Sequence, residues 1–372
     1  MRIFMSRRDH RLDERDRVLL IRLGAVGDVL RTLPALHLIR KTFPAVHLAW
    51  IVEDLSRELL DGHPEIDEVI RFPRREIRET ARRPRALMAR LIVLRRELRA
   101  RRFTAAVDFQ GSLKSGVLGL LSGAPRRIGF APGHCREFSF LLTNEWVRPH
   151  GRRLNRVEKN CLLAEALGAA GDEIEVVLPE RPEEGRQAES MVRSLNPGRA
   201  PLAVLSPGTS RRQAAKRWPP VYFGRLASLL AGSSGALPLV VFGPGEETLA
   251  REAVSASGGR AVLAPPTSLR LLAAVLRRSA LFVGADTGPM HLAWTVGCPV
   301  VALFGPTDPA LNAPLGPMHA VLREGRSTAR INPDQAYEAA RRLLPPRSLA
   351  HASGAPRLSR AALFAGASGP GR

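Results

Sequence analysis

The chain has 372 residues, enough for two domains with separate cores, and its 45% hydrophobic and 24% charged residues are typical of a globular protein. Lysine and arginine exceed aspartate and glutamate by 56 − 35 = 21, which favours anionic partners such as lipid or phosphorylated glycolipid, whereas the low aromatic content argues against nucleic acid. No apolar run approaches the roughly 20 residues of a membrane span, and residues 1–17 lack the apolar core of a signal peptide, so we expect a cytoplasmic protein.

The N-terminal half alternates apolar strands with helical patterns. A strand is predicted over 17–23, followed by a glycine-containing turn and a helix over about 29–42. Further strands are predicted over 46–52, 68–72, 105–109 and 127–130.

Arginine is densest between residues 71 and 102, where leucines recur at helical spacing (Leu87, Leu91, Leu94 and Leu98) with Arg90, Arg95, Arg96 and Arg99 between them. Such a helix could lie on an anionic membrane with its apolar side down, or its leucines could pack on their own domain. We favour packing for the leucines and leave the role of the arginines open.

The C-terminal half repeats the alternation. Strands are predicted over 202–205, 237–242, 260–263, 280–284 and 300–304, and helices over 221–230, 248–255, 269–278 and 290–296. This order predicts parallel sheets covered by helices on both faces.

The same patterns predict the domain boundaries. We expect a flexible basic extension over 1–16, an N-terminal domain over 17–180 and a linker over 181–200, which is rich in proline, glycine and charge. A C-terminal domain over 201–344 and a disordered tail over 345–372 complete the division.

The segment GAVGDVLRTLPAL, residues 24–36, places Asp28 between the end of the first predicted strand and the start of the following helix. Its glycines permit a tight turn and close ligand approach, but their spacing is not a full dinucleotide fingerprint. Asp28 could cap the following helix or act as a general base.

Two segments of the second half place polar groups at strand ends. LSPGTSRRQAAKRWP, residues 205–219, combines the hydroxyls of Thr209 and Ser210 with Lys216, and such groups suit a phosphate. In FGPGEE, residues 242–247, Glu246 or Glu247 could bind a ribose or base, or could simply begin a helix.

VGADTGPMHLAWTVG, residues 283–297, predicts a strand, a turn and a helix start bearing Asp286, Thr287 and Gly288. The free N–H groups of that helix start attract phosphate, and His291 can face the same ligand. The alternative is an ordinary N-cap with His291 on the surface.

The turn GPTDP that follows, within residues 301–309, could add Thr307 and Asp308 to the pocket or only shape it. The segments from 205 onward all follow strands of the second half, which is where open α/β sheets bind ligands.

In this order, and with DFQGSLKSG at 108–116, the segments resemble glycosyltransferase family 9, the ADP-heptose:lipopolysaccharide heptosyltransferases. The resemblance covers roughly residues 17–344. It implies an α/β GT-B architecture, two Rossmann-like doubly wound domains facing a central cleft, with the acceptor on the N-terminal domain and the nucleotide-sugar donor on the C-terminal one.

The resemblance also implies residue roles. Asp28 resembles the family's proposed catalytic base, and Lys114 is a candidate for acceptor contacts. The donor-binding residues would be Thr209, Ser210, Lys216, Glu246 (with Glu247 as the alternative), Asp286, Thr287, Gly288 and His291.

The implied reaction is an inverting transfer of heptose from ADP-heptose to the lipopolysaccharide inner core. No cofactor or metal is expected, and the chain lacks the Asp-x-Asp pair of a carboxylate metal clamp. We expect a monomer, peripherally associated with the inner face of the inner membrane through the anionic surface and its lipid A-linked acceptor. The alternatives are a transferase or epimerase for another nucleotide-sugar, and a non-catalytic polyanion-binding protein.

Overall fold

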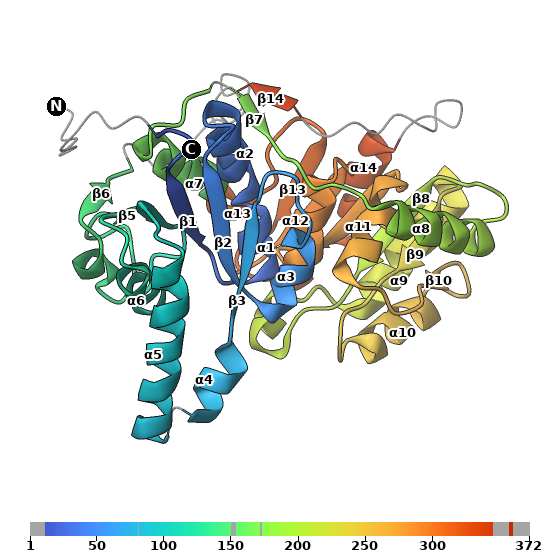
Figure 1. The fold of residues 1–372 in the computed structure, drawn as a ribbon. Coiled ribbons are helices and arrows are strands. Elements are labelled where there is room, and N and C mark those ends of the chain that lie inside the picture. Colours follow the sequence, from blue (N-terminus) through green and yellow to red (C-terminus); the bar gives the residue numbers. More distant parts are fainter. Residues whose placement is uncertain (1–11, 81, 150–153, 172, 345–356, 360–372) are drawn as a thin grey trace. The chain divides into compact units, whose positions relative to one another are not determined.

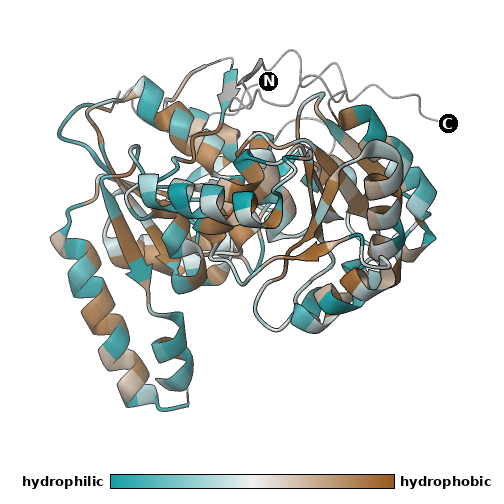
Figure 2. Ribbon diagram, turned by 90° about the vertical axis from the view of Figure 1, so that its right-hand side faces the viewer, coloured by the Kyte–Doolittle hydropathy of each residue, from teal (hydrophilic) through white to brown (hydrophobic). Residues whose placement is uncertain are grey.

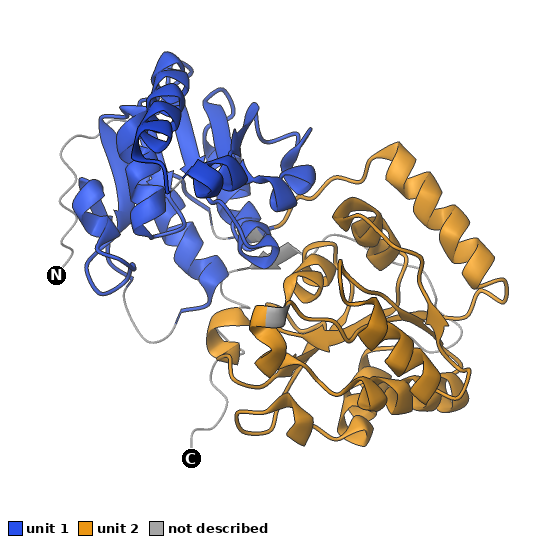
Figure 3. Cartoon of the chain, turned by 90° about the horizontal axis from the view of Figure 1, so that it is seen from below, with its two compact units in different colours: residues 1–175 blue, residues 176–372 orange. Residues whose placement is uncertain are grey.

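The computed structural model describes residues 12–80, 82–149, 154–171, 173–344 and 357–359 (Figure 1). Most of the predicted N-terminal extension and most of the predicted C-terminal tail lie outside these residues. The chain divides into two compact units, residues 1–175 and 176–372, which Figure 3 shows in separate colours.

Unit 1 contains a parallel six-stranded sheet in the order β3-β2-β1-β4-β5-β6. This is the Rossmann strand order, in which the chain reverses direction across the sheet between β1 and β4. The strands are β1 (Arg17–Ile21), β2 (His47–Glu53), β3 (Glu68–Phe72), β4 (Ala105–Asp108), β5 (Arg126–Phe130) and β6 (Glu145–Val147), and β7 (Glu173–Glu175) ends the unit.

Helices connect these strands. They are α1 (Val26–Leu30), α2 (Leu33–Thr42), α3 (Asp54–Leu60), α4 (Arg74–Thr80), α5 (Pro84–Ala100), α6 (Leu113–Ser122), the 3₁₀ turn η1 (Ser139–Leu142) and α7 (Arg156–Ala166). The helix predicted over 29–42 is therefore two helices. The hydroxyl of Thr32 donates to the carbonyl of Asp28 at 2.9 Å, and Pro34 occupies the first turn of α2, so the break falls at Arg31 and Thr32.

Unit 2 repeats the same topology, with a parallel sheet in the order β10-β9-β8-β11-β12-β13. The strands are β8 (Leu202–Ser206), β9 (Leu237–Val240), β10 (Val262–Leu263), β11 (Leu281–Ala285), β12 (Val300–Phe304) and β13 (His319–Arg323); β14 is Arg357–Ser359. The helices are α8 (Pro182–Leu195), η2 (Arg211–Lys216), α9 (Pro220–Leu229), the π turn η3 (Leu230–Ser234), α10 (Glu247–Ala256), α11 (Leu269–Arg277), α12 (Gly288–Thr295), α13 (Pro309–Asn312), η4 (Thr328–Arg330) and α14 (Pro333–Leu343).

Residues 181–200, predicted as a linker, instead contain helix α8. This helix belongs to unit 2 and packs against α11. It buries only Gly185 and Ala188, so its packing uses small residues and leaves no pattern of large apolar side chains in the sequence.

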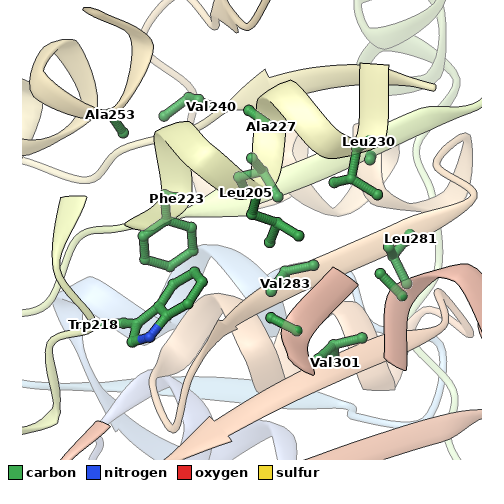
Figure 4. Packing of buried hydrophobic residues seen from close by; sticks show 14 of the residues in the cluster. Leu205, Trp218, Phe223, Ala227, Leu230, Val240, Ala253, Leu281, Val283 and Val301 are labelled. Atoms are coloured by element: carbon green, nitrogen blue, oxygen red, sulfur yellow. The ribbon is translucent and has the colours of Figure 1, made fainter. Parts of the chain in front are cut away.

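Apolar side chains fill the interior of both units. Figure 2 shows hydrophobic strands and helices with hydrophilic outer faces, and no described helix has the length and hydropathy of a membrane span. In the core of unit 2 (Figure 4), the ring of Trp218 meets that of Phe223 edge-on at 4.7 Å between centroids. The Trp218 indole N–H also donates to the carbonyl of Ile331 at 2.9 Å. Trp218 thus anchors the end of the segment that carries Lys216.

Candidate functional site

The predicted donor-binding residues of unit 2 follow the carboxyl ends of neighbouring strands. Ser206 at the end of β8 pairs with Gly284 of β11, so the loops after these two strands begin side by side. Thr209 and Lys216 follow β8, and Asp286 follows β11. This is the switch point of the sheet, where doubly wound folds bind their ligands.

Asp286, Lys216 and His291 form one buried hydrogen-bonded cluster. The Lys216 ammonium lies 3.0 Å from Oδ2 of Asp286 and donates to the main-chain carbonyl of the same residue at 2.9 Å. Nε2 of His291 lies 3.2 Å from Oδ1 of Asp286. Burial would raise the pKa of Asp286, but the hydrogen bond from His291 and the charges of His291 and Lys216 lower it well below its ordinary value.

The start of α12 carries Thr287 and Gly288 as predicted. Thr287 is the N-cap residue, but its side chain makes no capping hydrogen bond, and its hydroxyl donates to the carbonyl of Ala285 at 3.3 Å. Asp286 is directed to Lys216 and His291. The simple N-cap interpretation is therefore wrong, and His291 is buried beneath the turn instead of lying on the surface.

Glu246, not Glu247, belongs to this group. Its Oε2 accepts the N–H of Gly243 at 3.0 Å, and its carboxylate lies directly against Gly208, where a Cβ would overlap it. Glu247 points outward and pairs with Arg251 at 2.6 Å. The absence of a side chain at Gly208 brings the loops after β8 and β9 together.

Two hydroxyls at this edge have no hydrogen-bond partner among the described residues. One is Oγ1 of Thr209, a residue only 4% exposed, and the other is Oγ1 of Thr307 after β12. Ser210 is exposed, and no side-chain hydrogen bond caps η2 there. Asp308 shapes its own turn, because its Oδ1 accepts the N–H of Ala310 at 3.1 Å. A buried hydroxyl without a hydrogen-bond partner lowers the stability of the fold. Such a hydroxyl is typical of a binding site in which the ligand supplies the missing partner.

In unit 1, Asp28 lies in the first turn of α1, and arginines surround it. Arg22 lies 2.7 Å from its Oδ2, Arg31 donates to Oδ1, and Arg156 lies 3.9 Å from Oδ1. The carboxylate keeps 22% exposure and does not cap the helix, whose N-cap residue is Ala25.

Sequence reasoning missed these arginines. Only Arg31, three residues after Asp28 on a helix, could have been recognised from spacing. Arg22 also donates to the carbonyl of Phe109 and so joins the loops after β1 and β4.

Lys114 lies in the first turn of α6, and the loop between β4 and this helix is braced by a buried acid. Asp108 accepts the N–H groups of Gln110 and Gly111 and the hydroxyl of Ser115, each at 2.9 Å. Burial nevertheless raises the pKa of Asp108 to about 6. Lys114 itself pairs with Glu53 at 2.8 Å and does not contact Asp28 in any described interaction.

The predicted donor-binding residues of unit 2 thus lie together at the carboxyl ends of neighbouring strands. In unit 1, Asp28 and Lys114 belong to separate groups of ion pairs. No group of three or more His, Cys, Asp or Glu side chains in the described ranges is arranged to hold a metal ion.

Comparisons with known proteins show the family and the fold of the chain. Residues 91–338 match the model of the family described as glycosyltransferase family 9 (heptosyltransferase). Lipopolysaccharide heptosyltransferase 1 of Escherichia coli K12 is 29% identical over 311 residues, which cover 83% of this chain and 94% of that protein.

Among solved structures, E. coli heptosyltransferase WaaC with ADP has a TM-score of 0.70 and 26% identity, covering 88% of this chain and 99% of that one. A glycosyl transferase family 9 structure from Veillonella parvula has a TM-score of 0.75 at 21% identity, covering 89% and 97%, and shows the fold alone.

Proposed function

Because this chain belongs to glycosyltransferase family 9, the heptosyltransferase family, and its Rossmann-like units form a GT-B fold, we propose that it transfers heptose from ADP-heptose to the inner core of lipopolysaccharide. The names of the related proteins support the substrate class. The observation that carries the proposal is the Asp286–Lys216–His291 cluster, together with the buried Thr209 hydroxyl, which has no hydrogen-bond partner among the described residues.

The donor diphosphate would bind at this edge of unit 2. Lys216 supplies a cation, Thr209 and Ser210 supply hydroxyl donors, and the start of α12 supplies free N–H groups and the positive end of its dipole. Negative charge grows on the departing ADP, and these groups would stabilise it in the transition state. Glu246 would accept hydrogen bonds from the nucleotide's sugar.

Asp28 would act as the general base. It removes the proton from an acceptor hydroxyl while that oxygen bonds to the anomeric carbon from the side opposite ADP, so the configuration inverts as the bond to ADP breaks. The surrounding arginines hold the Asp28 carboxylate in its orientation before the reaction. The proposal needs no metal, because Lys216 and the helix start carry the leaving-group charge.

The positive charge of the chain fits the acceptor. Phosphates and carboxylates of the inner core and lipid A are anionic, and a net charge of +21 attracts them. The enzyme would act as a peripheral protein at the inner face of the inner membrane, with Lys114 as a contact for the acceptor. Its membrane association should weaken as salt rises.

Calorimetric titration of the wild-type protein with ADP, UDP and GDP in the presence of a chelator tests the donor assignment. We expect selective binding of ADP. Preference for UDP or GDP would keep the fold but replace the donor with another nucleotide-sugar, and failure of all three would favour a polyanion-binding protein without catalysis.

A further inference from the structure

Helix α5 packs on unit 1 through one of its sides and mainly through its C-terminal half. Leu94 and Leu98 are buried in the core, whereas Leu87 and Leu91 nearer the N-terminus are only partly buried. Figure 1 shows α4 and the first half of α5 extending away from the sheet of unit 1. The prediction that these leucines pack on their own domain is thus confirmed for the C-terminal half of the helix.

The side of α5 next to the leucine stripe carries exposed apolar residues that the sequence pattern did not reveal. Met88 is 58% exposed and Ile92 is 44% exposed. At about 100° per residue, Met88 and Ile92 lie on one stripe, bordered by Arg85, Arg95 and Arg96. We call these five residues the outer face of α5.

Some arginines near this face pair with carboxylates of unit 1. Arg71, Arg75 and Arg101 each pair with a carboxylate at 2.6 to 2.8 Å. No ion pair joins Arg85, Arg95 or Arg96 to a carboxylate among the described residues. Their charge is therefore not neutralised within unit 1.

We propose that the outer face of α5 docks on an anionic lipid bilayer, with Met88 and Ile92 entering the headgroup region and the arginines contacting lipid phosphates. An amphipathic helix with apolar side chains between cations has the chemistry of an interfacial membrane helix. A nucleic acid would leave Met88 and Ile92 without partners. The inference rests on the proposed function in one respect, since an acceptor carried by lipid gives the enzyme a reason to visit the membrane.

A second exposed apolar group competes for this role. Leu141 in η1 and Trp146 in β6 are both more than half exposed. However, Glu137 precedes η1 and Glu145 lies in β6, and Arg126 is already paired with Glu145 at 2.8 Å. The charge of that group suits an anionic surface less well.

The test uses the full chain and vesicles of phosphatidylcholine with or without phosphatidylglycerol, free of any glycolipid. Wild-type protein should sediment with the anionic vesicles, and salt should release it. The triple variant Arg85→Gln/Arg95→Gln/Arg96→Gln should lose more than about tenfold in vesicle affinity, because each cation near an anionic leaflet is worth about fivefold.

The matched control removes three charges elsewhere, with Arg193→Gln/Arg225→Gln/Arg251→Gln, whose arginines are exposed and paired. It should bind almost as well as wild type. Equal losses in the two triple variants would show that net charge alone attracts the protein, and would overturn the assignment.

The apolar contribution is tested by Met88→Gln/Ile92→Gln against Leu55→Gln/Val221→Gln, which alters exposed apolar residues elsewhere. Only the first pair should weaken binding, with both variants unfolding at the wild-type temperature. Loss of binding in Leu141→Gln/Trp146→Gln, but not in the α5 variants, would move the docking surface to η1 and β6 and contradict the proposal.

Transfer to a delipidated, water-soluble acceptor separates this inference from the proposed function. Vesicle binding without any transfer would contradict the enzyme assignment and leave the docking face intact. Transfer by a wild-type protein that does not bind anionic vesicles would contradict only the proposed docking of the outer face of α5.

Discussion

Lys216 and Asp286 are 70 residues apart in sequence, yet the Lys216 ammonium reaches both the carboxylate and the main-chain carbonyl of Asp286. One lysine thereby joins the loop after β8 to the start of α12. It also places a cation at the residue that directly precedes the N-cap of that helix.

Replacing Lys216 with alanine should weaken ADP binding by at least about tenfold, because a charge-assisted contact to the diphosphate is lost. The variant should also lose on the order of 2 kcal/mol in unfolding free energy, since Asp286 stays buried with one partner fewer. Titration calorimetry and urea unfolding measure the two effects. Lys41→Ala, which removes an exposed lysine, is the control, and unchanged ADP affinity in Lys216→Ala would contradict the diphosphate role.

Thr209→Val should separate stability from binding. Valine keeps the shape of the side chain and removes a buried hydroxyl that has no partner among the described residues. The variant should unfold at the same or a higher temperature, because an unsatisfied polar group is removed, but it should bind ADP more weakly. A clear loss of stability with normal ADP affinity would mean that the hydroxyl serves the fold.

Gly208→Ala should displace Glu246, because the new methyl group would overlap its carboxylate. We expect weaker nucleotide binding and a lower unfolding temperature, with Gly198→Ala as the control, since nothing lies within 4 Å of a Cβ there. Adding Glu246→Ala to Gly208→Ala should restore the unfolding temperature without restoring binding. Recovery of both would remove Glu246 from the donor site.

Asp28→Ala should reduce transfer by at least about 100-fold while leaving ADP affinity unchanged, because a general base acts in the transition state and the donor binds unit 2. Steady-state assays with saturating donor, alongside ADP titration, measure this. Asp61→Ala removes an acid paired with an arginine elsewhere in unit 1 and is the control. Near-normal turnover of Asp28→Ala would exclude it as the base.

Asp108 should give the stability of the protein a distinctive pH dependence. Burial raises its pKa in the folded state to about 6, above the unfolded value near 4, so the folded state holds the proton more tightly. As the pH rises from about 4 to 6, Asp108 therefore lowers the free energy of unfolding, by on the order of 3 kcal/mol in total.

In the Asp108→Asn variant, the asparagine can still accept hydrogen bonds from the two backbone N–H groups. This variant should not lose stability between pH 4 and pH 6 in this way. Urea unfolding at pH 4 and pH 7 should show wild type losing stability relative to the variant. A constant difference between the two proteins at both pH values would contradict the raised pKa.

The fold followed from the sequence because the strands are continuous apolar runs, which parallel sheets covered on both faces require. Among the elements missed, β6 and β13 are edge strands whose residues are only partly buried or exposed, and α8 packs through glycine and alanine. Their positions depend on neighbours that local periodicity does not reveal.

Within the candidate site, residue types were predictable and their contacts were not. The turn at Asp286 and Thr287 could be recognised from the residues of one segment. The choice of Glu246 over Glu247 depends on the space above Gly208, and the arginine shell of Asp28 includes Arg156 from a distant helix. Such contacts arise only when the sheet brings loops from separate strands together.

The most direct test of the central claim is a transfer assay with ADP-heptose and a heptose-free inner-core acceptor in the presence of a chelator. Mass spectrometry should show an acceptor heavier by one heptosyl residue, with stoichiometric release of ADP, and NMR should show an inverted anomeric configuration. An unmodified acceptor with intact ADP-heptose, while a known heptosyltransferase modifies the same acceptor, would contradict the account.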